Sequence, residues 1–366
     1  MRGIEALATF AALTGALAAC AAIAGIERFE SFTPDDAGLS IDGAAVDAAC
    51  VGDACPTPSC VGPDCPELVV TGLVQPRALA LVEPLLVWTE LGVADAGADA
   101  EAGSDAGPDA GRGRTLRAVA KTGGVPSTLA EALTLPALRQ SRGDGGVTLA
   151  FDTRAATSSL PVSEVKSDGG LATVSTTNDL TAAAVSPSWF AVATTSSVQV
   201  APRATGTLGS VAEPTTASAL ALSGKTLFAS SVGATQVFVY DLSEVDDGAG
   251  GLTSTATAVG KATVLPLQEF YLDGDRLYVA NQAGSVESVL FDAGKGPTIP
   301  SVGGSSAVAM TADATHLYVA TATGIYAVEK ATGVAVLRHA RRAFGIAVDA
   351  TQMYWTEEGA IFRSRK

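Results

Sequence analysis

The stretch GIAVDATQMYWTE at residues 345–357 decides the fold, because weaker versions of it return along most of the chain. Each version ends in a short apolar segment that carries an aromatic residue. Successive versions lie roughly 40 residues apart, a period typical of repeat architectures built from one supersecondary unit. The aromatic anchors are Trp88, Phe151, Phe190, Phe228, Tyr278, Tyr318 and Tyr354. We therefore count seven units, and the one around Phe151 is the weakest copy.

Each unit is predicted to be a meander of short antiparallel strands. A first apolar strand, such as residues 346–348, precedes the aromatic strand, and turn residues such as Asp273 and Gly274 separate the two. Gly and Asp favour tight reversals of the backbone. Large and small apolar residues alternate within the strands, which suits sheets that are buried on both faces. This pattern predicts an all-β fold, and it excludes a helical repeat, whose apolar spacing would be near 3.6.

The two ends of the repeat region predict that the units close into a ring. The last unit stops after its third strand, at Lys366, and an apolar run at residues 68–74 precedes the first unit. Pairing that run with the last three strands would complete a sheet and remove an exposed edge. We therefore predict a seven-bladed β-propeller over residues 67–366, with six blades as the alternative.

Two copies of the phrase resemble a known class of repeat. The segments YWTE at residues 354–357 and VWTE at residues 87–90 are similar to YWTD-type and related NHL-type propeller repeats, with Glu357 and Glu90 in place of the final Asp. The resemblance implies a propeller that binds proteins or small ligands. YWTD propellers have six blades, which is why that number is kept as the alternative.

The N-terminus has the features of a secretory signal at residues 1–19, with Arg2 followed by an apolar run. The segment LAAC at residues 17–20 resembles the bacterial lipobox. The resemblance implies cleavage before Cys20, a lipid on its thiol and, from Ala21, sorting to the outer membrane. We expect a lipoprotein of the cell envelope, in the outer membrane or facing the periplasm. In the alternative, residues 6–26 carry no charge and could span a bilayer uncleaved.

Two segments outside the repeat carry further predictions. Residues 20–49 are poor in aromatic residues and are expected to form a flexible tether. Residues 50–66 contain Cys50, Cys55, Cys60 and Cys65, an even number in an exported chain, which predicts a small knob with two disulfides. A zinc site is the alternative, although zinc ligands are usually paired at closer spacing.

An insert at residues 92–113 is rich in Ala, Gly and Asp and interrupts a hairpin of the first unit. Clustered carboxylates could hold calcium, but the EF-hand order of ligands is missing. We expect a disordered loop.

The charge balance restricts the partners. The chain has 23 Lys and Arg against 38 Asp and Glu, a net charge of −15. An acidic surface argues against nucleic acid and against docking on anionic lipid by charge. We expect a monomer that the lipid anchor alone holds at the membrane.

No arrangement of residues points to catalysis, a metal or a cofactor. The chain has only two histidines, and neither belongs to a hydrolase, phosphate-loop or zinc-protease motif. His316 is expected at the edge of a turn. His339 belongs to a basic cluster at residues 338–342, which either binds an anionic polymer or balances an acidic protein. Neither histidine is flanked by a carboxylate in the sequence. We therefore expect a protein without enzymatic activity.

The residues that flank the inner strands are the remaining candidates for function, because propellers present them around the mouth of a central channel. We select Arg77, Asp179, Glu269 and Arg342 as candidate binding residues. The predicted function is that of a lipid-anchored binding or scaffold protein that recognises a protein or glycan of the envelope. The alternative is a propeller enzyme of the lyase, lactonase or quinone-dependent dehydrogenase type; an envelope protein without a small ligand is the third possibility.

Overall fold

The computed structural model divides into two compact units, residues 1–59 and 60–366, and the residues that it describes belong to the second. The described ranges are 65–91, 114–133, 136–140, 147–152, 161–177, 179–214, 216–231, 234–246, 252–264, 267–274, 276–281, 285–290, 294–299 and 307–366. The predicted signal peptide (1–19), Cys20, the tether (20–49), Cys50, Cys55, Cys60 and the insert (92–113) lie outside them. The predictions for these segments, including the pairing of Cys65, stay predictions.

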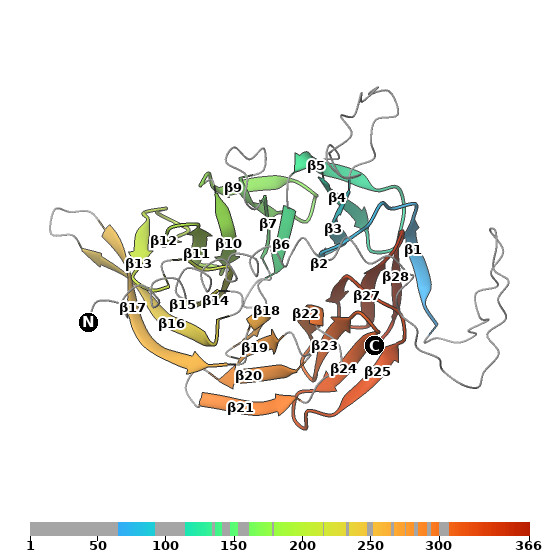
Figure 1. Cartoon of the computed structure of the whole chain (residues 1–366). Helices are drawn as coiled ribbons and strands as arrows, with labels where there is room; N and C mark the ends of the chain where they lie inside the picture. Colours follow the sequence, from blue (N-terminus) through green and yellow to red (C-terminus); the bar gives the residue numbers. More distant parts are fainter. Residues whose placement is uncertain are drawn as a thin grey trace, which may run out of the picture. The chain divides into compact units, whose positions relative to one another are not determined.

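The described residues form seven four-stranded antiparallel sheets, arranged as the blades of a β-propeller (Figure 1). The seven-bladed prediction is confirmed, and the six-bladed alternative is wrong. In each blade the strands follow one another in space as they do in sequence. The last blade is the exception, because its outer strand comes from the segment that precedes the first blade in the sequence. The inner strands of neighbouring blades contact each other all the way round the axis, including the first and last blades.

From the inner to the outer edge, blade 1 holds β2 (Leu79–Val82), β3 (Leu85–Leu91), β4 (Arg114–Ala120) and β5 (Ser127–Leu133). In the same order, blade 2 holds β6 (Pro136–Gln140), β7 (Thr148–Asp152), β8 (Val162–Val165) and β9 (Leu171–Ser175); blade 3 holds β10 (Leu180–Val185), β11 (Trp189–Thr194), β12 (Val198–Pro202) and β13 (Gly209–Val211). Blade 4 holds β14 (Ala219–Ser223), β15 (Thr226–Ser230), β16 (Gln236–Asp246) and β17 (Leu252–Thr263); blade 5 holds β18 (Leu267–Asp273), β19 (Arg276–Asn281), β20 (Val286–Leu290) and β21 (Gly294–Ile299). Blade 6 holds β22 (Ala307–Ala312), β23 (His316–Thr321), β24 (Ile325–Glu329) and β25 (Ala335–His339); blade 7 holds β26 (Gly345–Val348), β27 (Gln352–Glu357), β28 (Ala360–Arg365) and β1 (Glu67–Thr71).

The core lies between neighbouring blades, and the aromatic anchors fill it. One cluster joins Tyr318 and Ile325 of blade 6 to Ile346 and Trp355 of blade 7, and all four side chains are almost completely buried. Burial of one such aromatic side chain contributes about 2–3 kcal/mol. The second strand of a blade is therefore apolar on both faces, because each face packs on a different neighbour. This arrangement accounts for the large-small alternation in the sequence.

The ring closes through β1. This strand pairs with β28 in antiparallel register, with Val70 opposite Ile361 and Thr71 opposite Ala360. In Figure 1 the blue strand β1 accordingly lies beside the dark red strand β28. The backbone amide of Leu73 then donates to the carbonyl of Gly359 at 3.1 Å. The apolar run before the first repeat thus completes the last blade, as its sequence predicts.

The contact between blade 7 and blade 1, which we call the seam, is fastened at both ends of β26. At one end the Thr356 hydroxyl donates to the backbone carbonyl of Arg77 at 3.0 Å. A Cβ on Gly345 would lie only 2.5 Å from that same carbonyl oxygen, so the two backbones approach more closely than a side chain permits. At the other end the Lys121 ammonium lies 3.0 Å from Asp349 Oδ2.

The Asp349–Lys121 contact belongs to a repeated feature, which we call the aspartate clamp. An aspartate at the turn after an inner strand is bound by a lysine that follows the third strand of the next blade. The three clamps are Asp273 with Lys330, Asp313 with Lys366, and Asp349 with Lys121. In the last two clamps the aspartate also accepts a hydrogen bond at 2.9 Å from the tyrosine five residues later, Tyr318 or Tyr354. The clamps therefore tie blade 5 to blade 6, blade 6 to blade 7, and blade 7 to blade 1.

The outer hairpin of blade 4 is longer than the short strands that the sequence predicts. Strands β16 and β17 have 11 and 12 residues and extend over the outer strand of blade 3. The Ser254 hydroxyl donates to the carbonyl of Thr207 at 2.6 Å, and a Cβ on Gly209 would lie 2.0 Å from the Ser254 carbonyl oxygen.

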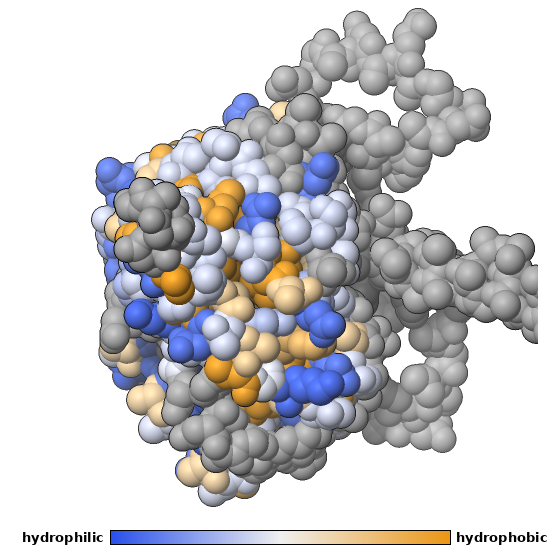
Figure 2. Space-filling view, turned by 90° about the vertical axis from the view of Figure 1, so that its left-hand side faces the viewer, coloured by the Kyte–Doolittle hydropathy of each residue, from blue (hydrophilic) through white to orange (hydrophobic). Residues whose placement is uncertain are grey.

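The side of the molecule seen in Figure 2 mixes hydrophobic with hydrophilic side chains over its surface.

Candidate ligand-binding site

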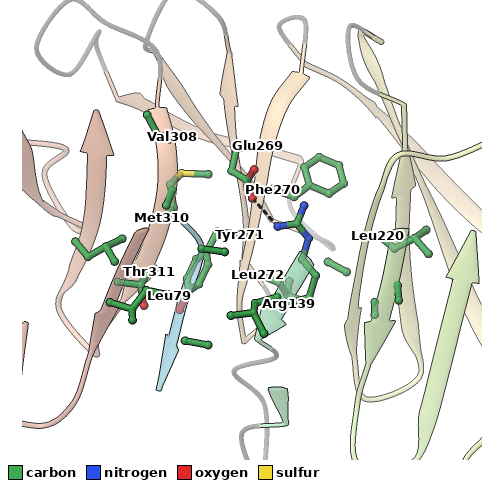
Figure 3. A pocket seen from close by; sticks show the side chains of 18 of the residues that line it. Leu79, Arg139, Leu220, Glu269, Phe270, Tyr271, Leu272, Val308, Met310 and Thr311 are labelled. Carbon is green, nitrogen blue, oxygen red and sulfur yellow. Dashed lines mark hydrogen bonds and ion pairs between the residues drawn. The ribbon is translucent and has the colours of Figure 1, made fainter. Parts of the chain in front are cut away.

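A cavity of about 310 Å³ lies on the axis, where the inner strands converge. Figure 3 shows side chains from several of these strands pointing into it. Most of its wall is apolar, because the parts of the inner strands that line it consist mainly of Ala, Leu and other apolar residues. Every blade contributes at least one residue to the wall: Leu79, Leu138, Ala184, Leu220, Tyr271, Met310 and Ile346.

One ion pair crosses the cavity. Arg139 on β6 of blade 2 and Glu269 on β18 of blade 5 come from opposite sides of the ring, and Arg139 Nη1 lies 3.5 Å from Glu269 Oε1 (Figure 3). Their side chains are 43% and 22% exposed, respectively. Partial burial of the Glu269 carboxyl in the cavity raises its pKa, although the charge of Arg139 acts in the opposite direction. The axis therefore carries a polar pair within an apolar wall.

The end of the cavity where the inner strands begin carries a cluster that we call the arginine mouth: Arg77, Phe344 and Arg342. The guanidinium carbons of Arg77 and Arg342 lie 4.2 and 4.6 Å from the centroid of the Phe344 ring. Stacking on an aromatic ring leaves the N–H groups of a guanidinium in its plane, where they can bind a carboxylate or phosphate.

The backbone holds the arginine mouth in place at the seam. The amide of Arg77 donates to the carbonyl of Thr89 at 2.8 Å, and the amide of Phe344 donates to the carbonyl of Thr356 at 3.0 Å. Arg77 precedes β2, and Phe344 precedes β26, so the two segments meet because the ring closes between blades 1 and 7. Arg77 and Phe344 line the cavity, and Arg342 lies beside them.

The four candidates from the sequence end up in different places. Arg77 and Glu269 line the cavity, and Arg342 joins the arginine mouth through Phe344. Asp179 is exposed before β10, with a left-handed backbone (φ 55°), and it does not line the cavity.

Sequence reasoning missed Arg139 and Phe344. Arg139 interrupts an apolar inner strand, a signal that could have identified it. Phe344 has no comparable signal.

His339 acquires a carboxylate partner that the sequence does not show. Its Nε2 lies 2.7 Å from Oε1 of Glu357, which comes from the next blade. The same oxygen accepts a hydrogen bond from the Trp355 indole at 2.8 Å. Burial alone would raise the pKa of Glu357, but the hydrogen bonds from His339 and Trp355 lower it. His339 and Glu357 lie outside the lining of the axial cavity.

A second copy of this arrangement explains the glutamate of the repeat. Glu90 accepts from the Trp88 indole at 3.0 Å and pairs with Arg117 at 2.7 Å. In both copies the tryptophan and the glutamate are two residues apart on one strand and therefore share a face. We infer that the extra methylene of Glu, compared with Asp, brings the carboxylate to the indole nitrogen. Glu357 thus joins blade 7 to blade 6, whereas these contacts of Glu90 hold two strands of blade 1 together.

The described part of the chain contains neither a cluster suited to a metal ion nor a membrane-spanning helix. It contains no group of three or more His, Cys, Asp or Glu side chains placed to hold a metal ion. Within the same ranges, no helix has the length and apolar character needed to cross a bilayer.

Comparisons with known proteins show the fold and nothing finer. No protein family matches the chain, and no curated protein matches its sequence. PorZ, a bacterial surface component of the type IX secretion system of Porphyromonas gingivalis, is 13% identical with a TM-score of 0.51, over 81% of this chain and 37% of PorZ. The extracellular domain of a one-component system from B. thetaiotaomicron is 9% identical with a TM-score of 0.52, over 82% of this chain and 40% of that one.

A chain of the mitotic checkpoint complex is 9% identical with a TM-score of 0.56, over 87% of this chain and 99% of that one. This chain spans less than half the length of PorZ and of the B. thetaiotaomicron domain. At these identities the likeness establishes the fold alone, which is that of a β-propeller.

Proposed function

We propose that the protein is a lipid-anchored recognition protein of the cell envelope, whose arginine mouth binds an anionic protein or glycan. The observation that carries the proposal is the cluster of Arg77, Phe344 and Arg342 beside an axial cavity, in a chain whose net charge is −15. A positive site on an acidic protein favours an anionic group and repels competing cations nearby. The stacked guanidiniums are held in place before a partner arrives, which lowers the entropic cost of binding.

The proposed location rests on the sequence of the N-terminus. The signal at residues 1–19 and the lipobox-like LAAC before Ala21 support export and a lipid on Cys20. PorZ and the B. thetaiotaomicron domain, which share the fold, are a surface component and an extracellular domain. Their locations agree with an extracytoplasmic one for this protein.

The proposal is tested with immobilised protein and envelope extract. The double variant Arg77→Gln/Arg342→Gln removes both charges of the arginine mouth, and Arg338→Gln removes an exposed arginine of the same basic cluster that does not contact Phe344. We expect one envelope component to be retained by the native protein and by the Arg338 variant but not by the double variant. Equal retention by the double variant would refute binding through the arginine mouth.

The alternative of a propeller enzyme stays a prediction. Glu269 is the one carboxylate among the described residues that line the cavity, and no histidine accompanies it there. No observation favours this alternative over recognition.

A further inference from the structure

We propose that the axial cavity binds a small organic monocarboxylate with an apolar body, and that Arg139 is the residue that binds its carboxylate. This inference rests on the proposed binding function and names a ligand class for the cavity beneath the arginine mouth. Size, wall chemistry, charge and the geometry of the Arg139–Glu269 pair each support it.

The size and walls of the cavity suit a small apolar ligand. Its volume of about 310 Å³ is at the lower end of the range found for ligand sites. Leu220, Tyr271 and Met310 project into it from three blades, as Figure 3 shows. A ligand with one aromatic ring or a short aliphatic chain would pack against these side chains, whereas a sugar would leave its hydroxyl groups unpaired against them.

The charges of the wall match one negative charge. Arg77 and Arg139 are the described cations of the lining, and Glu269 is the described anion, which leaves a net charge of +1. A monocarboxylate neutralises that charge. A phosphate monoester, which carries about −1.5 to −2 at neutral pH, would exceed it.

The geometry of Arg139 leaves room for a second anion. A guanidinium has five N–H donors, and the contact of Arg139 with Glu269 uses one edge of it at the long distance of 3.5 Å. The side chain is 43% exposed although it lies in the cavity. A ligand carboxylate could therefore pair with the guanidinium in the bidentate manner that this geometry favours. Glu269 would then compete with the ligand for Arg139, because both are carboxylates.

This competition gives the proposal a distinctive test, since the two partners of one ion pair should act in opposite directions. Binding of benzoate, hexanoate and the uncharged isostere benzamide to the full chain is measured by titration calorimetry. We expect benzoate or hexanoate to bind at least about tenfold more tightly than benzamide, as a charge-assisted contact implies. Arg139→Met should abolish this preference, Glu269→Gln should keep or tighten binding, and Arg338→Gln should change nothing.

Several results would overturn the proposal. They are the absence of binding of both acids to the native chain, equal affinity for benzoate and benzamide, and undiminished acid binding by Arg139→Met. Circular dichroism confirms that each variant is folded, and the comparison of acid with amide on the native chain needs no variant. Retention of the envelope component is measured in parallel on the native chain. Retention without acid binding refutes the ligand class alone, whereas acid binding without retention refutes the proposed recognition function alone.

Discussion

Removal of the aspartate clamp at the seam should destabilise the protein more than an average substitution. Asp349 accepts hydrogen bonds from the amides of Thr351 and Gln352 at 2.8 and 2.7 Å, from Tyr354 Oη at 2.9 Å and from Lys121 at 3.0 Å, and its side chain is 8% exposed. Asp349→Ala leaves the hydroxyl of the buried Tyr354 without this acceptor. The exposed amide of Thr351 and the ammonium of Lys121 can donate to water instead of Asp349.

The expected cost is about 3 kcal/mol, most of it from the buried hydroxyl and the charged acceptor, since each such loss is worth about 1–3 kcal/mol. Urea unfolding followed by circular dichroism measures it. Glu83→Gln is the matched control: Glu83 also pairs with Lys121, at 2.9 Å, but its side chain is 55% exposed. A surface pair contributes about 0–1 kcal/mol. A cost below about 0.5 kcal/mol for Asp349→Ala would show that the clamp does not fasten the ring.

Four further outcomes are expected. Tyr318→Phe should lower the free energy of unfolding by about 1 kcal/mol, because it removes the hydrogen bond from the Tyr318 hydroxyl to Asp313. Tyr278→Phe should leave the free energy of unfolding unchanged, because the buried Tyr278 hydroxyl has no hydrogen bond of normal geometry among the described residues. Equal costs of the two substitutions would contradict this difference. Glu90→Asp should cost about 1–2 kcal/mol in thermal unfolding through loss of the indole contact, and an unchanged Tm would refute the explanation for Glu in the repeat. Hydrogen bonds outweigh burial and lower the pKa of Asp349, so its contribution to the free energy of unfolding is complete above the unfolded pKa of about 3.9 and is lost as the pH falls through the lower folded value. Urea midpoints measured from pH 6 to pH 2 should therefore fall less steeply in Asp349→Asn than in the native protein. Parallel curves would contradict a lowered pKa of Asp349. Cys20→Ala should abolish the mass increase from lipid and release the protein from the membrane fraction, whereas retention there would contradict anchoring at Cys20.

The architecture is predictable because it follows from short-range patterns that recur. The aromatic anchors mark the second strand of each blade, and the apolar run at residues 68–74 has no partner until it meets β28. Blade 2 is hardest to predict, since Phe151 lies in the weakest copy of the phrase. The reach of the β16–β17 hairpin over blade 3 is not predictable either, because it depends on close backbone approach at Gly209.

The candidate site is only partly predictable because its contacts join distant parts of the chain. Arg77 follows from its position beside an inner strand and Glu269 from its position near the start of one. The same reasoning selects Asp179, which lies apart from the cavity. The partnership of Arg139 with Glu269 crosses the ring. The approach of Phe344 to Arg77 depends on ring closure. Neither the Arg139–Glu269 contact nor the approach of Phe344 to Arg77 can be predicted from the period of the repeat.

The seam and the arginine mouth are one piece of structure. Arg77 belongs to the connection from β1 to β2, and Phe344 belongs to the connection from β25 to β26, so the stacked cluster exists only if the N-terminal strand joins the last blade. The hydrogen bond from Thr356 to the Arg77 carbonyl and the close approach at Gly345 hold these connections together. A change that frees β1 should therefore weaken both the fold and the proposed binding.

Hydrogen–deuterium exchange of peptides that cover β1 (Glu67–Thr71) and β28 (Ala360–Arg365) tests this closure most directly. We predict that their paired amides exchange at similar slow rates, within about tenfold of each other, because they open in one cooperative unit. Exchange of β1 at the rate of an unpaired segment, while β28 stays protected, would contradict a ring closed by β1 and, with it, the origin of the arginine mouth.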